Sequence, residues 1–138
     1  MNLKKFFNKK KILITGHTGF KGSWLVHWLS RYNVSIMGIS LNVDQKLSAF
    51  KFINKKKLID KRFNIIEYKK LERNILKFEP DIIYHFAAQA LVKESVINPL
   101  ETFKTNIIGT ANILNCINKL NKKTISVIIT SDKCYQNL

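Results

Sequence analysis

The sequence predicts an α/β protein built on a parallel, doubly wound sheet, and three observations predict it. Short apolar segments that suit buried strands alternate along the chain with segments of helical periodicity. Glycines recur at every third position, 16, 19 and 22, between the first predicted strand and the first predicted helix. Small and polar residues follow three of the predicted strands, and parallel strands would gather these residues at one edge of the sheet.

The first predicted unit is a strand, the glycine turn, a helix and a second strand. The run Ile12–Ile14 is apolar without alternation, which is typical of a strand covered on both faces. A helix is expected to follow the glycines and to end near Arg31. Its apolar side chains recur at helical spacing: Trp24, Leu25, Trp28 and Leu29. Residues 34–39 predict the second strand, with Ser40 at its carboxyl end.

The middle of the chain is less regular. Residues 41–62 predict a loop with one or two short helical turns, since their apolar residues follow no clear period. A short third strand is predicted at residues 63–66, and a helix at 69–78 that Pro80 ends. A fourth strand begins at Asp81 and leads into the small residues that follow it.

A long helix and a fifth strand complete the predicted fold. Asn98 as cap and Pro99 at the first position predict a helix that reaches about Leu120, and Asn106 is expected to bond backbone and pin this helix to the sheet. Its buried face is expected to carry Phe103, Ile107, Ile108, Ala111, Leu114 and Ile117. With a fifth strand at residues 125–130, right-handed crossovers imply a Rossmann-like sheet of strand order 3-2-1-4-5, truncated after strand five, in one domain over residues 1–138.

The formal net charge of +15 first suggests a nucleic-acid partner. Lysine outnumbers arginine 21 to 3, however, and arginine is the residue preferred for specific phosphate and base contacts. The lysines are therefore interpreted as solvated surface, and no nucleic acid is expected. The two cysteines, Cys116 and Cys134, lie far apart and are expected to be reduced thiols. No metal site, membrane span or secretory signal is indicated, so we expect a cytoplasmic protein.

The glycine turn predicts a dinucleotide site, with an ordinary glycine-rich loop as the alternative. Glycine lets the backbone approach a ligand closely, and the helix that follows points free N–H groups and its positive dipole end at the turn. The preceding strand and following helix are the context that a dinucleotide fingerprint requires. An acid that selects NAD usually stands about 20 residues further on. Ser40 occupies the strand end and Asp44 follows, so Ser40 permits NAD or NADP.

Three segments resemble the CDP-glucose 4,6-dehydratases, a branch of the extended short-chain dehydrogenase/reductase superfamily. They are residues 15–24 (TGHTGFKGSW), 85–92 (HFAAQALV) and 130–135 (TSDKCY). The resemblance covers the chain except residues 41–62. The combination of His17 and Lys21 distinguishes this sequence from the sugar epimerases of the superfamily. Lys133 distinguishes it from the dTDP-glucose dehydratases, which carry Glu at that position.

The resemblance implies a tightly held NAD that oxidises CDP-glucose at C4. Water is then lost across C5 and C6, and the hydride returns to C6. The resemblance also implies that the product is used in the cytoplasm to make dideoxysugars for lipopolysaccharide O-antigen. It also implies a homodimer. With the turn itself, it suggests a set of cofactor-binding residues. They are Gly16, His17, Gly19, Phe20, Lys21, Gly22, Ser40, Asn64, Ile65, Phe86, Ala87, Ala88, Gln89 and Thr130.

Several of these residues keep a structural alternative. His17 could instead cap the turn, and Lys21 could be a solvated lysine of the first helical turn. Asn64 stands where the family usually has an Asp that contacts adenine, and its amide oxygen could still accept that bond. His27 and His85 are expected to be structural histidines.

The resemblance also implies the catalytic residues. Asp132 would protonate the departing C6 hydroxyl, Lys133 would help to remove the C5 proton or hold the charge that forms, and Ser131 would hydrogen-bond the C4 hydroxyl. The family's Tyr-x-x-x-Lys pair does not occur in these 138 residues. We therefore expect the N-terminal part of a dehydratase, inactive alone. The alternatives are another nucleotide-sugar epimerase or dehydratase, or a non-catalytic dinucleotide-binding module.

Overall fold

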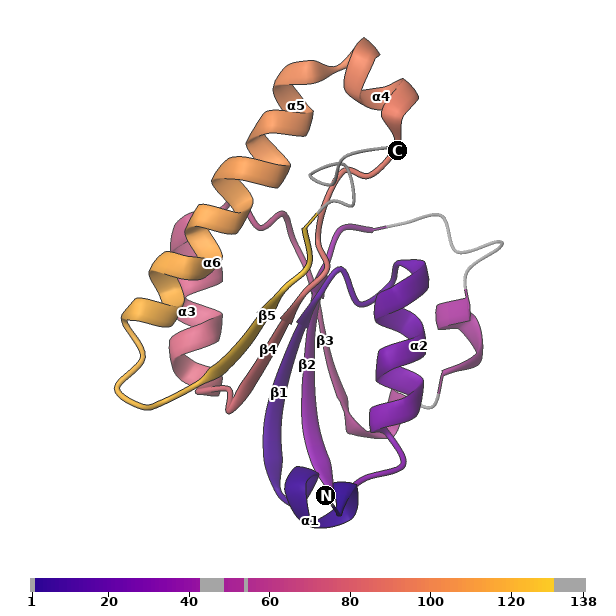
Figure 1. The fold of residues 1–138 in the computed structure, drawn as a ribbon, viewed down its shortest axis with the longest axis vertical. Coiled ribbons are helices and arrows are strands. Elements are labelled where there is room, and N and C mark those ends of the chain that lie inside the picture. The colour runs from indigo at the N-terminus through magenta and orange to yellow at the C-terminus, as the bar shows by residue number, and fades with distance from the viewer. Residues whose placement is uncertain (1, 43–48, 54, 131–138) are drawn as a thin grey trace, which may run out of the picture.

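A computed structural model describes residues 2–42, 49–53 and 55–130. Five parallel strands form one sheet in the order β3-β2-β1-β4-β5 (Figure 1), which confirms the predicted topology. The strands are β1 (Lys10–Thr15), β2 (Val34–Ser40), β3 (Leu58–Arg62), β4 (Ile82–His85) and β5 (Ile125–Ile128). The order reverses between β1 and β4, and ligands of such sheets bind at this switch point, outside the carboxyl ends of the strands.

Helices cover both faces of the sheet. The α-helices of the described residues are α1 (Leu3–Phe7), α2 (Phe20–Leu29), α3 (Tyr68–Phe78), α4 (Val92–Ile97), α5 (Pro99–Phe103) and α6 (Gly109–Asn118). A π-helical segment, η3 (Lys104–Ile108), lies between α5 and α6, and two short 3₁₀ turns are η1 (Ala49–Phe52) and η2 (Lys55–Lys57). α2 lies on one face, and α3 and α6 lie on the other (Figure 1). α4 and α5 extend beyond the carboxyl edge of the sheet.

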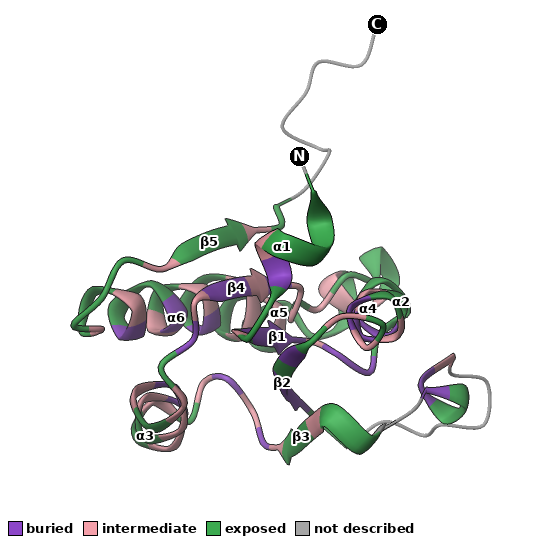
Figure 2. Ribbon diagram, turned by 90° about the horizontal axis from the view of Figure 1, so that it is seen from below, coloured by how far each residue is buried: buried purple, intermediate pink, exposed green. Residues whose placement is uncertain are grey.

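Alternate residues of β1 supply two separate apolar cores. Ile12 and Ile14 pack on the α2 side, in a cluster with Val26 and Leu29. Leu13 packs on the opposite side, in the cluster that contains residues of α3 and α6. Both faces of β1 are therefore buried (Figure 2), which explains why its sequence is a continuous apolar run rather than an alternating one.

The prediction of a third strand at residues 63–66 is wrong, because β3 ends at Arg62. The Phe63 N–H still donates to the Ser40 carbonyl at 3.0 Å, but the chain then turns. Asn64 closes this turn: its Oδ1 accepts from the Ile66 N–H at 3.1 Å. Phe63 and Ile65 are buried because they reach the α3 and α6 core from the turn, not because they belong to a strand. The short helical turns expected in residues 41–62 are present as η1 and η2. The loop expected there is wrong over residues 58–62, which form β3.

The buried face predicted for the long helix is also wrong. Phe103 is 59% exposed and Ile107 57%, and Ile108, Ala111 and Leu114 are exposed as well, whereas Ile117 is half-buried. Gly109, Ile113 and Cys116 face the sheet instead. The predicted entry at Pro99 is present, but Asn98 makes no capping hydrogen bond with its side chain. That side chain donates to the Glu94 carboxylate.

β5 forms an outer edge of the sheet with exposed apolar side chains. Ile125, Val127 and Ile129 are all exposed, and most of the β5 ribbon has the colour of exposed residues in Figure 2. Cys116 is a buried free thiol whose pKa is raised by burial to about 11, as suits a small apolar residue. Cys134 lies outside the described residues. None of the helices in the described part of the chain has the length and apolar character needed to cross a membrane.

Candidate functional site

The glycine turn between β1 and α2 is held by close backbone contacts. Gly16 has a φ of +71°, a left-handed conformation that side chains rarely adopt. Its N–H donates to the Ile39 carbonyl at 2.8 Å, and its carbonyl accepts from the Gly19 N–H at 3.0 Å. A Cβ at Gly16 would lie 2.8 Å from the Ala87 nitrogen. The turn is therefore packed directly against the backbone that follows β4.

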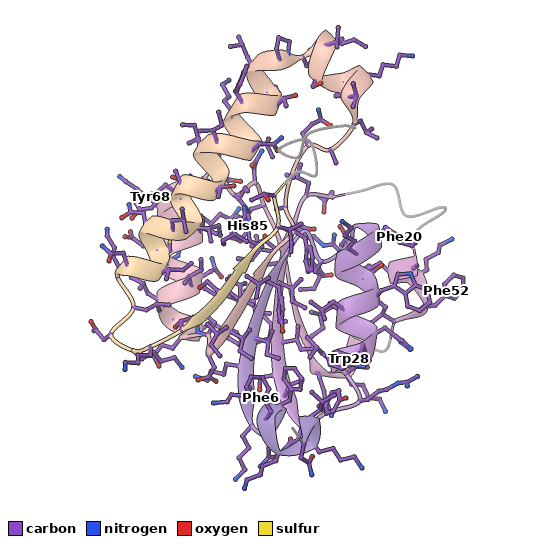
Figure 3. All side chains as sticks on the ribbon, viewed as in Figure 1. Phe6, Phe20, Trp28, Phe52, Tyr68 and His85 are labelled. Atoms are coloured by element: carbon purple, nitrogen blue, oxygen red, sulfur yellow. The ribbon has the colours of Figure 1, made fainter. Side chains whose placement is uncertain are left out.

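The N-terminus of α2 opens from this turn with unpaired donors. Its N-cap is Gly19, which offers no side chain to cap the helix. The N–H groups of Phe20, Lys21 and Gly22 have no acceptor within the helix, as in any first helical turn. With the positive end of the helix dipole, these N–H groups form an anion-binding position. The Phe20 side chain is 78% exposed and does not close it (Figure 3).

Two pockets at the carboxyl edge of the sheet meet beside the glycine turn, because Ala87 and Ala88 line both. The first, of about 190 Å³, lies over the ends of β1, β2 and β3. It is lined by Gly16, Thr18, Gly19, Ser40, Leu41, Phe63, Asn64, Ile65, Phe86, Ala87, Ala88 and Thr105. The second lies over the ends of β4 and β5 and is lined by Lys21, Ala87, Ala88, Gln89, Ala90, Val92, Asn106, Thr110, Ile128, Ile129 and Thr130.

Most of the sequence-predicted cofactor residues line one of these pockets, and three do not. Gly22 packs beneath the turn, where a Cβ would lie 2.3 Å from the Gly16 carbonyl oxygen. Phe20 points outward, and His17 is fully buried. The predicted catalytic residues 131–133 lie outside the described residues.

Sequence reasoning missed several lining residues. Thr18 and Leu41 adjoin predicted site residues along the chain and could have been found from that position alone. Thr105 and Thr110 carry no sequence signal, since only the packing of the long helix brings them to the pockets.

His17 supports the turn from below. Its Nε2 lies 3.0 Å from Asp60 Oδ1, and its ring packs edge-on against Phe50. A Cβ at Gly38 would lie 2.3 Å from the His17 ring, so the glycine on β2 makes room for it. Burial lowers the pKa of His17, and the nearby Arg62 lowers it further, against the opposing effect of Asp60. A neutral imidazole therefore bridges the turn to β3.

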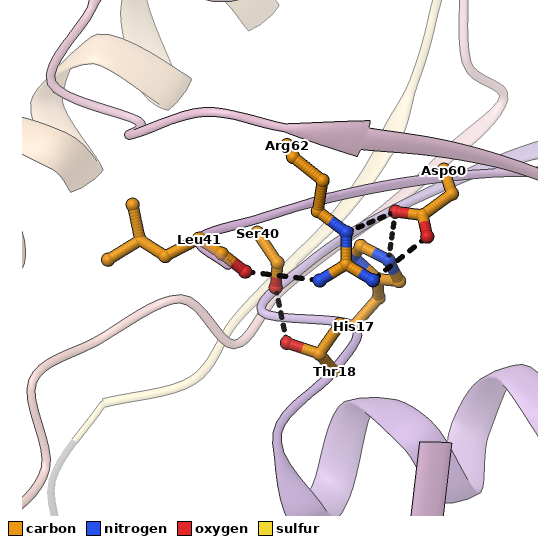
Figure 4. Close-up of polar contacts among 6 residues, drawn as sticks. All are labelled: His17, Thr18, Ser40, Leu41, Asp60 and Arg62. Carbon is orange, nitrogen blue, oxygen red and sulfur yellow. Dashed lines mark hydrogen bonds and ion pairs between the residues drawn. The ribbon is translucent and has the colours of Figure 1, made fainter. Parts of the chain in front are cut away.

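Asp60 also holds Arg62, the last residue of β3. The Arg62 Nε lies 2.7 Å from Asp60 Oδ1, and one terminal nitrogen donates to Oδ2 at 2.8 Å. The other terminal nitrogen donates to the Leu41 carbonyl at 3.1 Å. Figure 4 shows the guanidinium between the Asp60 carboxylate and the end of β2. Beside it, the hydroxyls of Ser40 and Thr18 are hydrogen-bonded at 2.9 Å.

His85 joins two strands to α6 (Figure 3). Its Nδ1 is hydrogen-bonded to Thr15 Oγ1 at 2.6 Å, and its Nε2 to Thr110 Oγ1 at 2.9 Å. The same Thr15 oxygen accepts from the Ala87 N–H at 3.2 Å. Burial lowers the pKa of His85 to about 4. This agrees with the expected structural histidine, which here fixes the backbone that both pockets share.

Asn106 fixes the next residues along that backbone. Its Oδ1 accepts from the Gln89 N–H at 2.8 Å, and its Nδ2 donates to the Gln89 carbonyl at 2.9 Å. The expectation that Asn106 pins the long helix to the sheet is confirmed, with the partner being the segment that follows β4.

These features define a class of protein. A parallel sheet of order 3-2-1-4-5, a glycine turn that opens a helix N-terminus, and two adjoining pockets at the switch point are the features of a Rossmann-like α/β fold.

Comparison with known proteins gives the family. Residues 13–137 match the family described as GDP-mannose 4,6 dehydratase, and the chain belongs to that family. The chain is 38% identical over 135 residues to CDP-glucose 4,6-dehydratase of Salmonella typhimurium, which covers 97% of the chain and 38% of that protein. It is 30% identical over 114 residues to UDP-glucose 4-epimerase of Mycoplasma genitalium, covering 83% of the chain and 34% of the relative. The chain thus spans less than two fifths of the length of each of these relatives.

Solved structures show the same fold. The UDP-glucose 4-epimerase of Stenotrophomonas maltophila with bound NAD matches with a TM-score of 0.80 at 22% identity, over 94% of this chain and 39% of that one. The UDP-glucose 4-epimerase of Thermus thermophilus in complex with NAD matches with a TM-score of 0.68 at 27% identity, over 80% of this chain and 34% of that one.

Proposed function

We propose that this chain is the cofactor-binding part of a CDP-glucose 4,6-dehydratase, with NAD lying across the two adjoining pockets. The observation that carries the proposal is the meeting of both pockets at Ala87 and Ala88, beside the free N–H groups of α2. A dinucleotide has two nucleosides joined by a pyrophosphate, and this arrangement offers two cavities joined by an anion-binding turn. The NAD in the Thermus thermophilus epimerase complex supports the choice of cofactor.

The residues present fit such a group. The bare turn of Gly16 and Gly19 leaves the pyrophosphate position free of side chains, and the backbone N–H groups of Phe20 and Lys21 would hold it. Asn64, at the β3 end of the first pocket, supplies a carboxamide at the adenine end. Gln89 and Thr130 line the second pocket, where the nicotinamide half would lie.

The chemistry would take place beyond β5. Bound NAD would supply hydride transfer from and to the sugar. Ser131, Asp132 and Lys133 follow Thr130 directly, and Thr130 lines the second pocket. In this proposal Ser131 hydrogen-bonds the C4 hydroxyl, Asp132 protonates the departing C6 hydroxyl, and Lys133 removes the C5 proton or holds the charge that forms. An acid beside a lysine is suited to this work, since each can set the other's protonation state.

The similarity to CDP-glucose 4,6-dehydratase favours a dehydratase over an epimerase, and the similarity to UDP-glucose 4-epimerases makes the epimerase the second candidate. Incubation of a protein that contains this chain and also supplies a Tyr-x-x-x-Lys pair, with NAD and either CDP-glucose or UDP-glucose, distinguishes them. Formation of a 4-keto-6-deoxy sugar nucleotide from CDP-glucose supports the dehydratase, and formation of UDP-galactose from UDP-glucose supports the epimerase. From residues 1–138 alone we expect neither product, because these residues contain no Tyr-x-x-x-Lys pair.

We also propose a homodimer in the cytoplasm, formed through the long helical segment and engaged in dideoxysugar synthesis for O-antigen. The support is an exposed apolar surface on α4, α5, η3 and α6. It carries Val92, Val96, Ile97, Leu100, Phe103, Ile107, Ile108 and Leu114.

Cofactor binding is the first test. NADH added to the purified chain should bind saturably, measured by nucleotide fluorescence. Gly19→Ala places a methyl group 3.3 Å from the Gly16 carbonyl oxygen, a contact that the turn can absorb. Gly19 lines the first pocket, so in this proposal the methyl group lies on the side of the turn that the cofactor occupies. It should weaken NADH binding while the thermal unfolding midpoint stays close to that of the parent chain. Absence of NADH binding to the folded parent chain would refute the proposal.

A further inference from the structure

We propose that the groove between β3 and α3 binds an extended, acidic segment of a partner protein, which joins the sheet as a strand beside β3 and faces the cations of α3. The groove has a volume of about 580 Å³. Apolar side chains of β2, β3 and α3 line it together with five basic ones. The basic residues are Lys61, Arg62, Lys70, Arg73 and Lys77.

The strand beside the groove has an open edge. Among the described strands, β3 pairs only with β2 and ends the sheet on its other side. Figure 2 shows it at the opposite end of the sheet from β5. Residues 59–61 are exposed. An edge strand presents N–H and C=O groups that an extended peptide can join by main-chain hydrogen bonds.

The register of the sheet gives the side of β3 on which a partner meets the cations. Ile59 is paired with Met37 and Lys61 with Ile39, and both partners on β2 belong to the core on the α3 side. Asp60, between them, reaches His17 on the other face. Side chains of an added strand that share a face with Ile59 and Lys61 would therefore point toward α3, at every second position of the partner.

The cations of α3 lie on one helical face. Lys70, Arg73 and Lys77 follow at intervals of three and four residues, which places them in a row along the groove. Arg73 and Lys77 are exposed and make no ion pair with another described residue. Lys61 likewise has no ion-pair partner among the described residues. Carboxylates at alternate positions of an added strand would meet these three charges.

The acids near the groove already have partners. Glu67 lies 3.4 Å from the Lys70 ammonium, and Glu72 pairs with Lys119 of the helix that packs beside α3. Asp60 is held by Arg62 on the opposite face of β3. The groove therefore keeps an excess of positive charge, which is complementary to an acidic partner.

The same features argue against two other occupants. A second copy of the chain that paired through β3 would bring its own Lys61 toward the cations of α3, and like charges on facing strands destabilise the pair. Single-stranded nucleic acid stacks its bases on aromatic rings. Phe63 is buried and carries the Lys70 ammonium 4.8 Å from its ring centre, and Phe78 is half-buried. The open strand edge and apolar floor favour a peptide.

The test uses a fluorescein-labelled peptide of four Glu-Thr repeats, titrated with the chain and followed by fluorescence anisotropy. We expect saturable binding that weakens as salt rises. The same peptide with every backbone nitrogen methylated keeps its charges but cannot donate to β3, and should bind at least about tenfold more weakly. Binding of the unmodified peptide should also slow amide hydrogen exchange within residues 58–62, measured by NMR. Saturating NADH should not displace it, because the groove is separate from the cofactor pockets.

Matched variants test the role of the cations. Arg73→Gln combined with Lys77→Gln should weaken peptide binding about three- to tenfold, as expected for two exposed ion pairs. Lys69→Gln combined with Lys123→Gln removes the same net charge at exposed positions outside the groove and should change binding less than twofold. All four residues are exposed, so the variants should remain folded, which circular dichroism confirms.

Several results would overturn the proposal. They are absence of binding, equal affinity for the methylated peptide, equal losses in the two double variants, and displacement by NADH. Tighter binding of a five-nucleotide oligothymidylate, which carries the same number of charges, would assign the groove to nucleic acid instead. None of these outcomes affects the proposed function, whose test is the binding of NADH itself.

Discussion

Gly22 lies so close to Gly16 that a Cβ on Gly22 would stand 2.3 Å from the Gly16 carbonyl oxygen and 2.7 Å from the His17 Cα. The third glycine of the turn therefore serves the packing of α2 on the turn, whereas Gly19 lines the first pocket. The two glycines have different tasks within one motif, and this difference can be measured.

Gly22→Ala should destabilise the fold by about 3 kcal/mol, since the methyl group overlaps backbone that cannot move aside. Urea unfolding followed by circular dichroism gives the free energy of unfolding. Gly19→Ala is the matched control and should cost less than about 1 kcal/mol, because its nearest contact is 3.3 Å. Equal losses in the two variants would contradict the division of tasks.

The strand order and the glycine turn could be predicted because their signals are local. The run at Ile12–Ile14 and the spacing of Gly16, Gly19 and Gly22 each lie within a few residues. The same is true of Ala87 and Ala88 after β4, which the structure places at the meeting of both pockets.

The third strand could not be placed from its sequence because β3 is an edge strand. Its residues 59–61 are exposed, so they carry no apolar run, and the nearby apolar pair Phe63 and Ile65 is buried from a turn instead. The buried face of the long helix was predicted wrongly for a related reason. Periodicity identifies the face with the most apolar side chains, and here that face, with Phe103 and Ile107, points outward. The face that packs on the sheet is the one with Gly109 and Ile113.

Stability should depend on the protonation of His85. Its pKa is near 4 in the folded chain and near 6.5 when unfolded, so the unfolded chain binds a proton more readily between these values. The stability linked to neutral His85 is complete above pH 6.5, declines as the pH falls toward 4, and amounts to about 3 kcal/mol.

His85→Gln should therefore flatten the dependence of unfolding free energy on pH between 6.5 and 4.5, with the remaining slope due to His17, whose pKa is also lowered. Thr110→Val removes a hydrogen-bond partner of His85 but keeps the titrating ring. The pH dependence of the unfolding free energy should therefore persist in Thr110→Val. Urea titrations at several pH values measure both. An unchanged slope in His85→Gln would argue against a neutral buried ring.

Asn106→Ala should release the segment after β4 that lines the second pocket. Loss of two hydrogen bonds to the Gln89 backbone should cost about 1–3 kcal/mol and expose the Gln89 amide to solvent exchange. Hydrogen exchange monitored by NMR reads that amide directly. Asn118→Ala, at an exposed position near the end of the same helical segment, should leave the protection of Gln89 intact. Retained protection in Asn106→Ala would show that Asn106 does not hold this segment.

The claim on which the account depends is that the turn of residues 16–22 holds the pyrophosphate of a nicotinamide dinucleotide, and a crystal structure of the chain soaked with NADH tests it most directly. We expect the pyrophosphate within hydrogen-bond distance of the backbone nitrogens of Phe20 and Lys21, with the adenosine over Ser40 and the nicotinamide over Gln89. Density for the dinucleotide at any other surface, with the α2 N-terminus free of it, would contradict the account.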